Sequence, residues 1–281
     1  GKIALCANTT GSCNVAIGVE AMDSNTTGGG NVGIGTDSLQ GNTEGSSNVS
    51  IGDDTMKTNS TGTQNTAVGA AALCTNSTAS NNTAIGYLAL CSNTTADNNT
   101  SIGVSSLRSN TTGTSNVAVG NNALKTQTTA DGNTALGSDT LCTITSGAGG
   151  NTAVGQKALE DDTTGFYNTS VGSLSLCQNT EGSCNVAIGR EALRNNTTAD
   201  NNTAVGKSAL GTNTTGGSNT ALGCGALFDN TTGGSNIAIG KGSLINNTTA
   251  SDNTSIGTNA MIINTTGACN VAVGSSALYS N

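Results

Sequence analysis

The chain has 281 residues and a net charge of −8, with 9% charged and 2% aromatic residues, 40 Gly, 9 Cys and no His, Trp or Pro. A large mixed core is excluded, because such cores depend on aromatic volume. The missing His removes the commonest general base and metal ligand, so we expect neither an enzyme nor a cofactor. Few basic residues and no apolar run of ~18–20 residues argue against a nucleic-acid partner and a membrane span in this segment.

The sequence is a tandem repeat with a period of 17 residues. The consensus N-[TV]-A-[VI]-G-x-x-A-L-x-x-N-T-T-G-x-x defines repeat positions 1 to 17. Its first Asn stands at 14, 31, 48, 65, 82, 99, 116, 133, 151, 168, 185, 202, 219, 236, 253 and 270. A one-residue insertion falls between Asn133 and Asn151. Residues 1–281 are therefore expected to form a single repeat array.

Within each repeat, positions 1–5 predict a strand. β-Branched residues at positions 2 and 4 are expected to face the interior, and the small residue at position 3 the other way. Gly at position 5 suits a corner, and a second short strand around positions 8–10 would bring Leu at position 9 against positions 2 and 4. Asn-Thr-Thr-Gly at positions 12–15 predicts a return turn. The expected fold is all-β, a parallel β-solenoid or β-roll of about 16 coils, one repeat per coil.

Small residues recur at positions 3 and 8, and two interpretations remain open. They fit a tight interior, or they form flat faces that three chains pack around a common axis. We favour the parallel homotrimer, because a 17-residue coil has little core of its own. The chain begins at position 5 (Gly1) and ends at position 12 (Asn281) without distinct caps. A segment of a longer chain is expected, with end-to-end joining of copies as the alternative.

At N-[VT]-A-[IV]-G-x-x-A, as in residues 14–18 and 185–189, the chain resembles the YadA-like head repeats of trimeric autotransporter adhesins. Residues 82–95 are similar to tandem-repeat arrays in phage and bacterial fibre proteins. The resemblance covers the whole chain and implies a left-handed, trimeric, parallel β-roll on a cell or virion surface. The period departs from the roughly fourteen residues of adhesin heads.

The cysteines follow the repeat. Cys6 and Cys13, like Cys177 and Cys184, flank a turn, and Cys74 and Cys91 share position 10 in neighbouring coils, about 4.8 Å apart. We predict disulfides among these six and hence an extracellular location, with buried reduced thiols as the alternative. The pattern assigns no pairing to Cys142, Cys224 or Cys269, and the absence of His and C-x₂-C argues against zinc.

Position 12 begins an N-x-[ST] sequon in eleven repeats. Glycosylation is a hypothesis for these turn residues, although such turns favour Asn and Thr in any case. The sequons begin at Asn8, Asn25, Asn59, Asn76, Asn93, Asn110, Asn196, Asn213, Asn230, Asn247 and Asn264.

Three other features suggest chemistry less strongly. The acidic runs 53–54 and 160–162 are interpreted as exposed loop carboxylates, because no partner recurs beside them. The adjacent aromatics Phe166 and Tyr167 could stack on a sugar ring. Thr-Thr ladders suggest ice binding, but they lie in turns and are broken at Glu44, Ser146 and Glu181.

The sequence therefore predicts a structural fibre segment, the shaft or head of an extracellular, cell-surface or virion-surface protein, that acts as a rigid spacer with an adhesion role. The alternative is a self-assembling, N-glycosylated extracellular filament. An ice- or carbohydrate-binding module is less favoured. The expected partners are other copies of the chain and a host-cell or surface glycan receptor.

Overall fold

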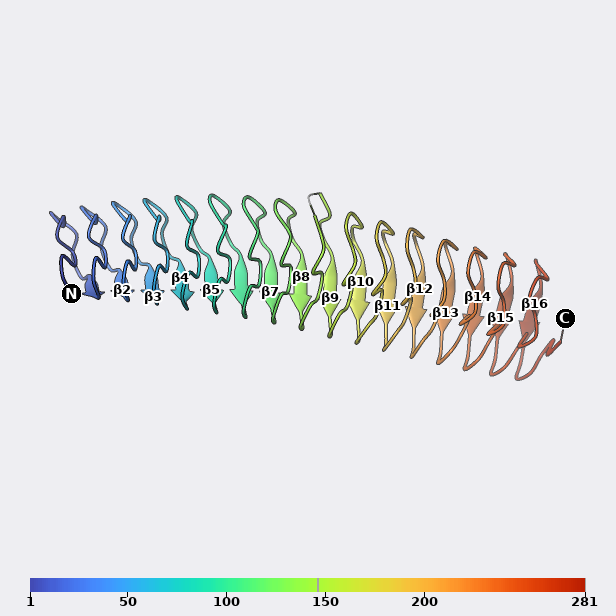
Figure 1. The fold of residues 1–281 in the computed structure, drawn as a ribbon. Helices are drawn as coiled ribbons and strands as arrows, with labels where there is room; N and C mark the ends of the chain where they lie inside the picture. The colour runs from blue at the N-terminus through green and yellow to red at the C-terminus, as the bar shows by residue number, and fades with distance from the viewer. Residues whose placement is uncertain (146, 281) are drawn as a thin grey trace. The chain divides into compact units, whose positions relative to one another are not determined.

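The computed structural model describes residues 1–145 and 147–280, so the predictions that involve Ser146 and Asn281 lie outside the described residues. The chain forms two compact units, Gly1–Ser138 with Thr145–Gly147, and Asp139–Ile144 with Ala148–Asn281. The division falls at the one-residue insertion. Each unit is a stack of coils that carry one short strand each (Figure 1).

The strands are three residues long and occupy repeat positions 2–4. The first unit contains β1 (Val15–Ile17), β2 (Val32–Ile34), β3 (Val49–Ile51), β4 (Thr66–Val68), β5 (Thr83–Ile85), β6 (Thr100–Ile102), β7 (Val117–Val119) and β8 (Thr134–Leu136). The second contains β9 (Thr152–Val154), β10 (Thr169–Val171), β11 (Val186–Ile188), β12 (Thr203–Val205), β13 (Thr220–Leu222), β14 (Ile237–Ile239), β15 (Thr254–Ile256) and β16 (Val271–Val273).

Consecutive strands within each unit pair in parallel, with identical repeat positions opposite one another. Val15 pairs with Val32 in the first unit, and Thr203 pairs with Thr220 in the second. The same register recurs between the other neighbouring strands of each unit. The predicted parallel β-solenoid with a 17-residue coil is therefore confirmed.

The direction of the strand side chains is opposite to the prediction. Position 3 is the buried one, as at Ala67, Ala84 and Ala118, which are fully buried. Positions 2 and 4 point outward and stay partly exposed. The interior is too narrow for β-branched side chains opposite Leu, because a Cβ at Gly33 (position 3) would already lie 3.1 Å from Met22 Cγ (position 9).

The second predicted strand is also wrong for the described residues. Positions 6–11 form consecutive turns, and positions 7 and 9 have left-handed backbone, as at Glu20 (φ 55°) and Met22 (φ 52°). This conformation is costly for non-glycine residues, by about 1–2 kcal/mol each. It turns Leu or Met at position 9 into the coil, where Leu39, Leu73 and their equivalents from Met22 to Met261 are fully buried. Their burial, at about 1.5–3 kcal/mol each, offsets the strain.

Two ladders of buried Asn complete the core. At position 12, Asn42 Nδ2 donates to Asn25 Oδ1 of the preceding coil (2.7 Å) and to Gly45 O of its own turn (2.9 Å). At position 1, Asn48 N donates to Asn31 Oδ1 (2.9 Å). Neutral amides suit this stacking, because an amide both donates and accepts, whereas stacked charges would repel.

Candidate functional site

The first candidate site is the outer sheet face, which we define as the outward side chains of positions 2 and 4, on β1–β8 in the first unit and on β9–β16 in the second. Position 4 is Ile, Val or Leu throughout, position 2 is Thr, Val or Ile, and no strand holds a charged residue. Ile51, Ile85 and Ile102 keep 37–38% of their surface exposed. In each unit the face is thus an uncharged strip with a continuous apolar row at position 4, of the kind that marks an interaction surface.

The small residues at positions 3 and 8 do not form a flat external face. Ala16 alone among the position-3 residues is half-buried, at the first strand, and the others are buried, as are Ser38, Thr55 and Ala72 at position 8. The interpretation that they pack chains around an axis is therefore wrong for these positions. They fill the narrow interior, and the surface available to another chain is the outer sheet face.

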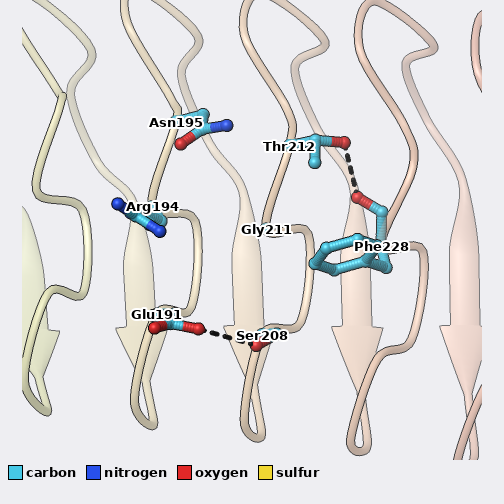
Figure 2. Close-up of a pocket in the computed structure, with 7 residues that line it drawn as sticks. All are labelled: Glu191, Arg194, Asn195, Ser208, Gly211, Thr212 and Phe228. Atoms are coloured by element: carbon cyan, nitrogen blue, oxygen red, sulfur yellow. Dashed lines mark hydrogen bonds between the residues drawn. The ribbon is translucent and has the colours of Figure 1, made fainter.

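The second candidate site is a pocket of about 210 Å³ in the second unit, outside the strands (Figure 2). It follows the position-10 row, in which Gly211 stands between Arg194 and Phe228 of the adjacent coils. Gly211 leaves the space open, and a Cβ on it would lie 2.8 Å from Phe228 Cε2. The lining residues are Glu191, Arg194, Asn195, Ser208, Gly211, Thr212 and Phe228.

The polar groups of this pocket differ in their partners. Glu191 accepts from Arg190 Nη2 (2.9 Å) and from Ser208 Oγ (3.3 Å), so its charge is balanced at the rim. Arg194 is exposed and takes part in none of the ion pairs of residues 1–145 and 147–280. The pocket thus offers a guanidinium for an anion beside the half-buried Phe228 ring for an apolar face.

Sequence reasoning missed this pocket, although a signal was present. When position 10 is read down the repeats of the second unit, Gly211 is its only glycine, and an aromatic residue follows 17 residues later. The pattern therefore shows that a residue without a side chain, Gly211, lies beside a large one, Phe228. It does not show that the Phe228 ring folds back over Gly211, which depends on the rotamer.

All nine cysteines are free thiols in the structure. Cys74 and Cys91 are half-buried in consecutive coils, as the shared position predicted. In each of the other two predicted pairs, one thiol donates a hydrogen bond to a residue other than its predicted partner. Cys6 Sγ donates to Asp23 O (3.5 Å) and Cys177 Sγ to Glu160 Oε2 (3.6 Å), both in an adjacent coil. The disulfides remain predictions.

The sequon asparagines do not lie on an open turn. Asn8 is half-buried, and the ten others are fully buried in the position-12 ladder. Their amide nitrogens are already engaged; Asn93 Nδ2, for example, donates to Asn76 Oδ1 (3.0 Å) and Ala96 O (3.0 Å). A glycan on such a nitrogen would displace the ladder. The acceptor sites that the hypothesis requires are therefore not accessible in the folded coils.

The acidic runs are exposed or half-buried, with one exception. Asp54 pairs with Lys57 Nζ (2.8 Å), and Asp53 and Asp161 are exposed. Asp162, in contrast, occupies position 12 and is fully buried, so the prediction of an exposed carboxylate is wrong there. Burial raises the pKa of Asp162 to about 7, against the opposing effect of hydrogen bonds from Asn179 and Gly165.

The adjacent aromatics lie on the surface of the second unit. The rings of Phe166 and Tyr167 meet edge to face, with centroids 5.4 Å apart and planes at 87°. Tyr167 is 68% exposed, and its ring lies against Gly150, where a Cβ would come within 2.5 Å of Cδ1. The pair is thus accessible to a flat ligand.

No protein-family model and no curated protein sequence matches the chain. Among residues 1–145 and 147–280, no three His, Cys, Asp or Glu side chains cluster in a way that could hold a metal ion. The same residues include no helix with the length and hydropathy needed to cross a bilayer.

Proposed function

We propose that the chain is a structural fibre segment that assembles as a parallel homotrimer through the outer sheet face and acts as a rigid spacer on an extracellular, cell or virion surface. The observation that carries the proposal is the uninterrupted, uncharged strip of Ile, Val and Thr along each unit. A strip of this kind is costly to leave in water.

The repeat geometry favours another copy of the chain as the partner. Outward side chains recur once per coil, about 4.8 Å apart, so two such faces have the same spacing and can interdigitate along their length. Six position-4 residues still expose 37–40% of their surface: Ile51, Ile85, Ile102, Leu136, Ile188 and Ile256. Covering each of them is worth roughly 0.5–1 kcal/mol. Summed over the exposed position-4 residues of a unit, this gain supports association with another copy.

Sedimentation of the full chain tests the assembly. We expect a species with three times the chain mass of 27.3 kDa. Its mass should stay the same on moderate dilution. A monomer would contradict the proposal, and a dimer would contradict its three-fold form. Mass that grows with concentration and long threads in electron micrographs would favour the alternative, a self-assembling filament. Thermal hysteresis in a monomeric sample would favour an ice-binding face instead.

The pocket supports a second candidate function, recognition of an acidic carbohydrate on a receptor glycan. Arg194 can pair with a carboxylate while the Phe228 ring packs against the apolar face of the sugar. The volume of about 210 Å³ suits one sugar ring. This function would give the fibre an adhesion role.

Titration with glucuronic acid, followed by protein NMR, tests the pocket. We expect millimolar binding that Arg194→Gln and Phe228→Leu each weaken at least about fivefold, with glucose binding more weakly than glucuronic acid because it lacks the carboxylate. Lys241→Gln is the control, since Lys241 is a cation of the same unit that lies outside the lining and takes no part in the ion pairs of residues 1–145 and 147–280. Equal affinity for both sugars, or binding unaffected by Arg194→Gln, would contradict this role.

A further inference from the structure

Cys74 and Cys91 are held side by side by the backbone of the first unit. Both occupy position 10, in consecutive coils, and the hydrogen bonds on either side fix their register. Leu73 N donates to Ala89 O (2.9 Å) and Thr75 N donates to Cys91 O (3.0 Å). Coils spaced by about 4.8 Å place the two Cα atoms within the range that a disulfide spans. The pair is half-buried, so small reagents can reach it.

Cations stand on both sides of this pair along the same row. Lys57 occupies position 10 of the coil before Cys74, and Arg108 that of the coil after Cys91. Lys57 is already paired, with Asp37 (2.9 Å) and Asp54 (2.8 Å). Arg108 is exposed and lies next to Cys91. The uncompensated positive charge is thus on the Cys91 side of the pair.

The two thiols consequently have different acidities. A hydrogen bond from Cys74, assisted by the charge of Arg108, lowers the pKa of Cys91 to about 7. The same hydrogen bond, together with burial, raises the pKa of Cys74 far above its ordinary value. Near neutral pH, Cys91 therefore exists partly as a thiolate, while Cys74 stays protonated and donates a hydrogen bond to the Cys91 sulfur.

Cys177 shows what the neighbouring charge contributes. It also occupies position 10, but Glu160 stands at this position in the preceding coil, and Cys177 Sγ lies 3.6 Å from Glu160 Oε2. Burial, and next the charge of Glu160, raise the pKa of Cys177 to about 11. The same backbone position thus carries an unreactive thiol where the neighbour is an anion.

We propose that Cys74 and Cys91 form a reactive dithiol site that exchanges with low-molecular-weight disulfides, with Cys91 as the attacking thiolate and Cys74 as the resolving thiol. The Cys91 sulfur attacks one sulfur of the reagent, R–S–S–R, and forms a mixed disulfide while R–S⁻ leaves and takes up a proton. Cys74 then loses its proton and attacks the Cys91 sulfur, which expels the second R–S⁻. The protein dithiol is oxidised to a Cys74–Cys91 disulfide, and the reagent is reduced to two thiols.

Residue-resolved alkylation of the full-length chain tests the first step. With iodoacetamide at pH 7, Cys91 is expected to react at least about tenfold faster than Cys177, because the thiolate is the reactive form. Arg108→Gln should slow Cys91 severalfold, whereas Lys125→Gln, the next cation on the row, should not. Equal rates for Cys91 and Cys177, or no effect of Arg108→Gln, would overturn the assignment of Cys91.

Oxidised glutathione tests the second step. Cleavage after Lys and Arg releases residues 58–108, which contain Cys74 and Cys91 and no other cysteine. We expect this peptide to lose the mass of two hydrogen atoms, while residues 158–190, with Cys177 and Cys184, react much more slowly. Cys74→Ser should trap glutathione on Cys91, and Cys91→Ser should leave Cys74 unmodified. Failure to form the disulfide, or a glutathione adduct on Cys74 in Cys91→Ser, would overturn the proposal.

Discussion

Asp162 is the residue at which the position-12 ladder is least satisfied. Its Oδ1 accepts from Asn179 Nδ2 (3.0 Å) and Gly165 N (3.1 Å), but its buried Oδ2 has no hydrogen-bond partner among the described residues. Position 12 of the preceding repeat is Ile144, a residue without a side-chain donor. A carboxylate is therefore held at a position where every other coil except that of Ile144 places an amide, and burial favours its protonated form.

We predict that Asp162 makes the free energy of unfolding depend on pH. Its pKa rises from 3.8 in the unfolded chain to about 7 in the folded one, so the folded state binds the proton more tightly. Its contribution to stability is greatest below pH 4 and is lost as the pH rises toward 7, by about 2–4 kcal/mol. Urea unfolding at pH 4.5 and pH 8 measures this difference.

Asp162→Asn should remove most of that pH dependence and stabilise the protein at pH 8. Asp161→Asn, which removes a charge from the exposed neighbour, is the control and should have a much smaller effect. If Asp162→Asn left the difference between the two pH values unchanged, the carboxyl group would not be its source.

Glycine is required at position 5 for two reasons, the backbone conformation and the close approach of the next coil. Gly103 has φ 132°, a conformation that L side chains rarely adopt, and a Cβ there would lie 2.5 Å from Gly120 O of the next coil. We expect Gly103→Ala to reduce the free energy of unfolding by about 2–4 kcal/mol, because strain and overlap add. Thermal or urea unfolding measures the loss.

Gly132 provides the comparison for backbone strain alone. It has φ 68°, and a Cβ there would meet no atom within 4 Å. Position 17, which it occupies, is Asn at 98 with a similar φ of 63°. Gly132→Ala should therefore cost only about 1 kcal/mol. Equal losses for the two variants would mean that the close approach of the coils at Gly103 is not important.

At the scale of the element, alternate positions of each strand have different roles, one inside the coil and one on its surface. Position 3 fills the coil, whereas positions 2 and 4 supply the outer sheet face. A charge on that face should prevent association and leave the coil intact. We predict that Ile239→Asp on β14 converts the assembly to monomers without changing the circular dichroism spectrum, as measured by sedimentation.

Ile245 offers a matched control in the turn segment after β14. It is a half-buried isoleucine at position 10, outside the strand. Ile245→Asp introduces the same charge and should leave the oligomeric state unchanged. If both variants dissociate, the charge acts through general destabilisation and not through the outer sheet face.

The strand itself could be predicted from the sequence, but its orientation could not. β-Branched residues at positions 2 and 4 usually indicate the buried side of a strand. The left-handed backbone at positions 7 and 9 changes this, because it places Leu in the coil and leaves room only for Ala, Ser or Gly opposite. Nothing in the residue types of Glu20 and Met22, for instance, marks that conformation, since it is unusual for residues with a Cβ.

At the scale of the whole molecule, the period predicted the architecture because every contact must repeat. The register of Val15 with Val32 and of Thr203 with Thr220 follows directly from the spacing. The pocket and the cysteine pair were harder to predict, because they depend on departures from the repeat. Gly211 beside Phe228, and Cys74 beside Cys91, become visible only when each position is read from coil to coil.

The fixed register also determines how the chain can fold. Within each unit, every strand pairs with residues 17 positions away, so no coil waits for a distant part of the sequence. Short loops close at small entropic cost, and folds built from near-neighbour contacts form quickly. During synthesis, a finished coil exposes the template on which the next one docks. Such a chain can therefore fold progressively as it leaves the ribosome.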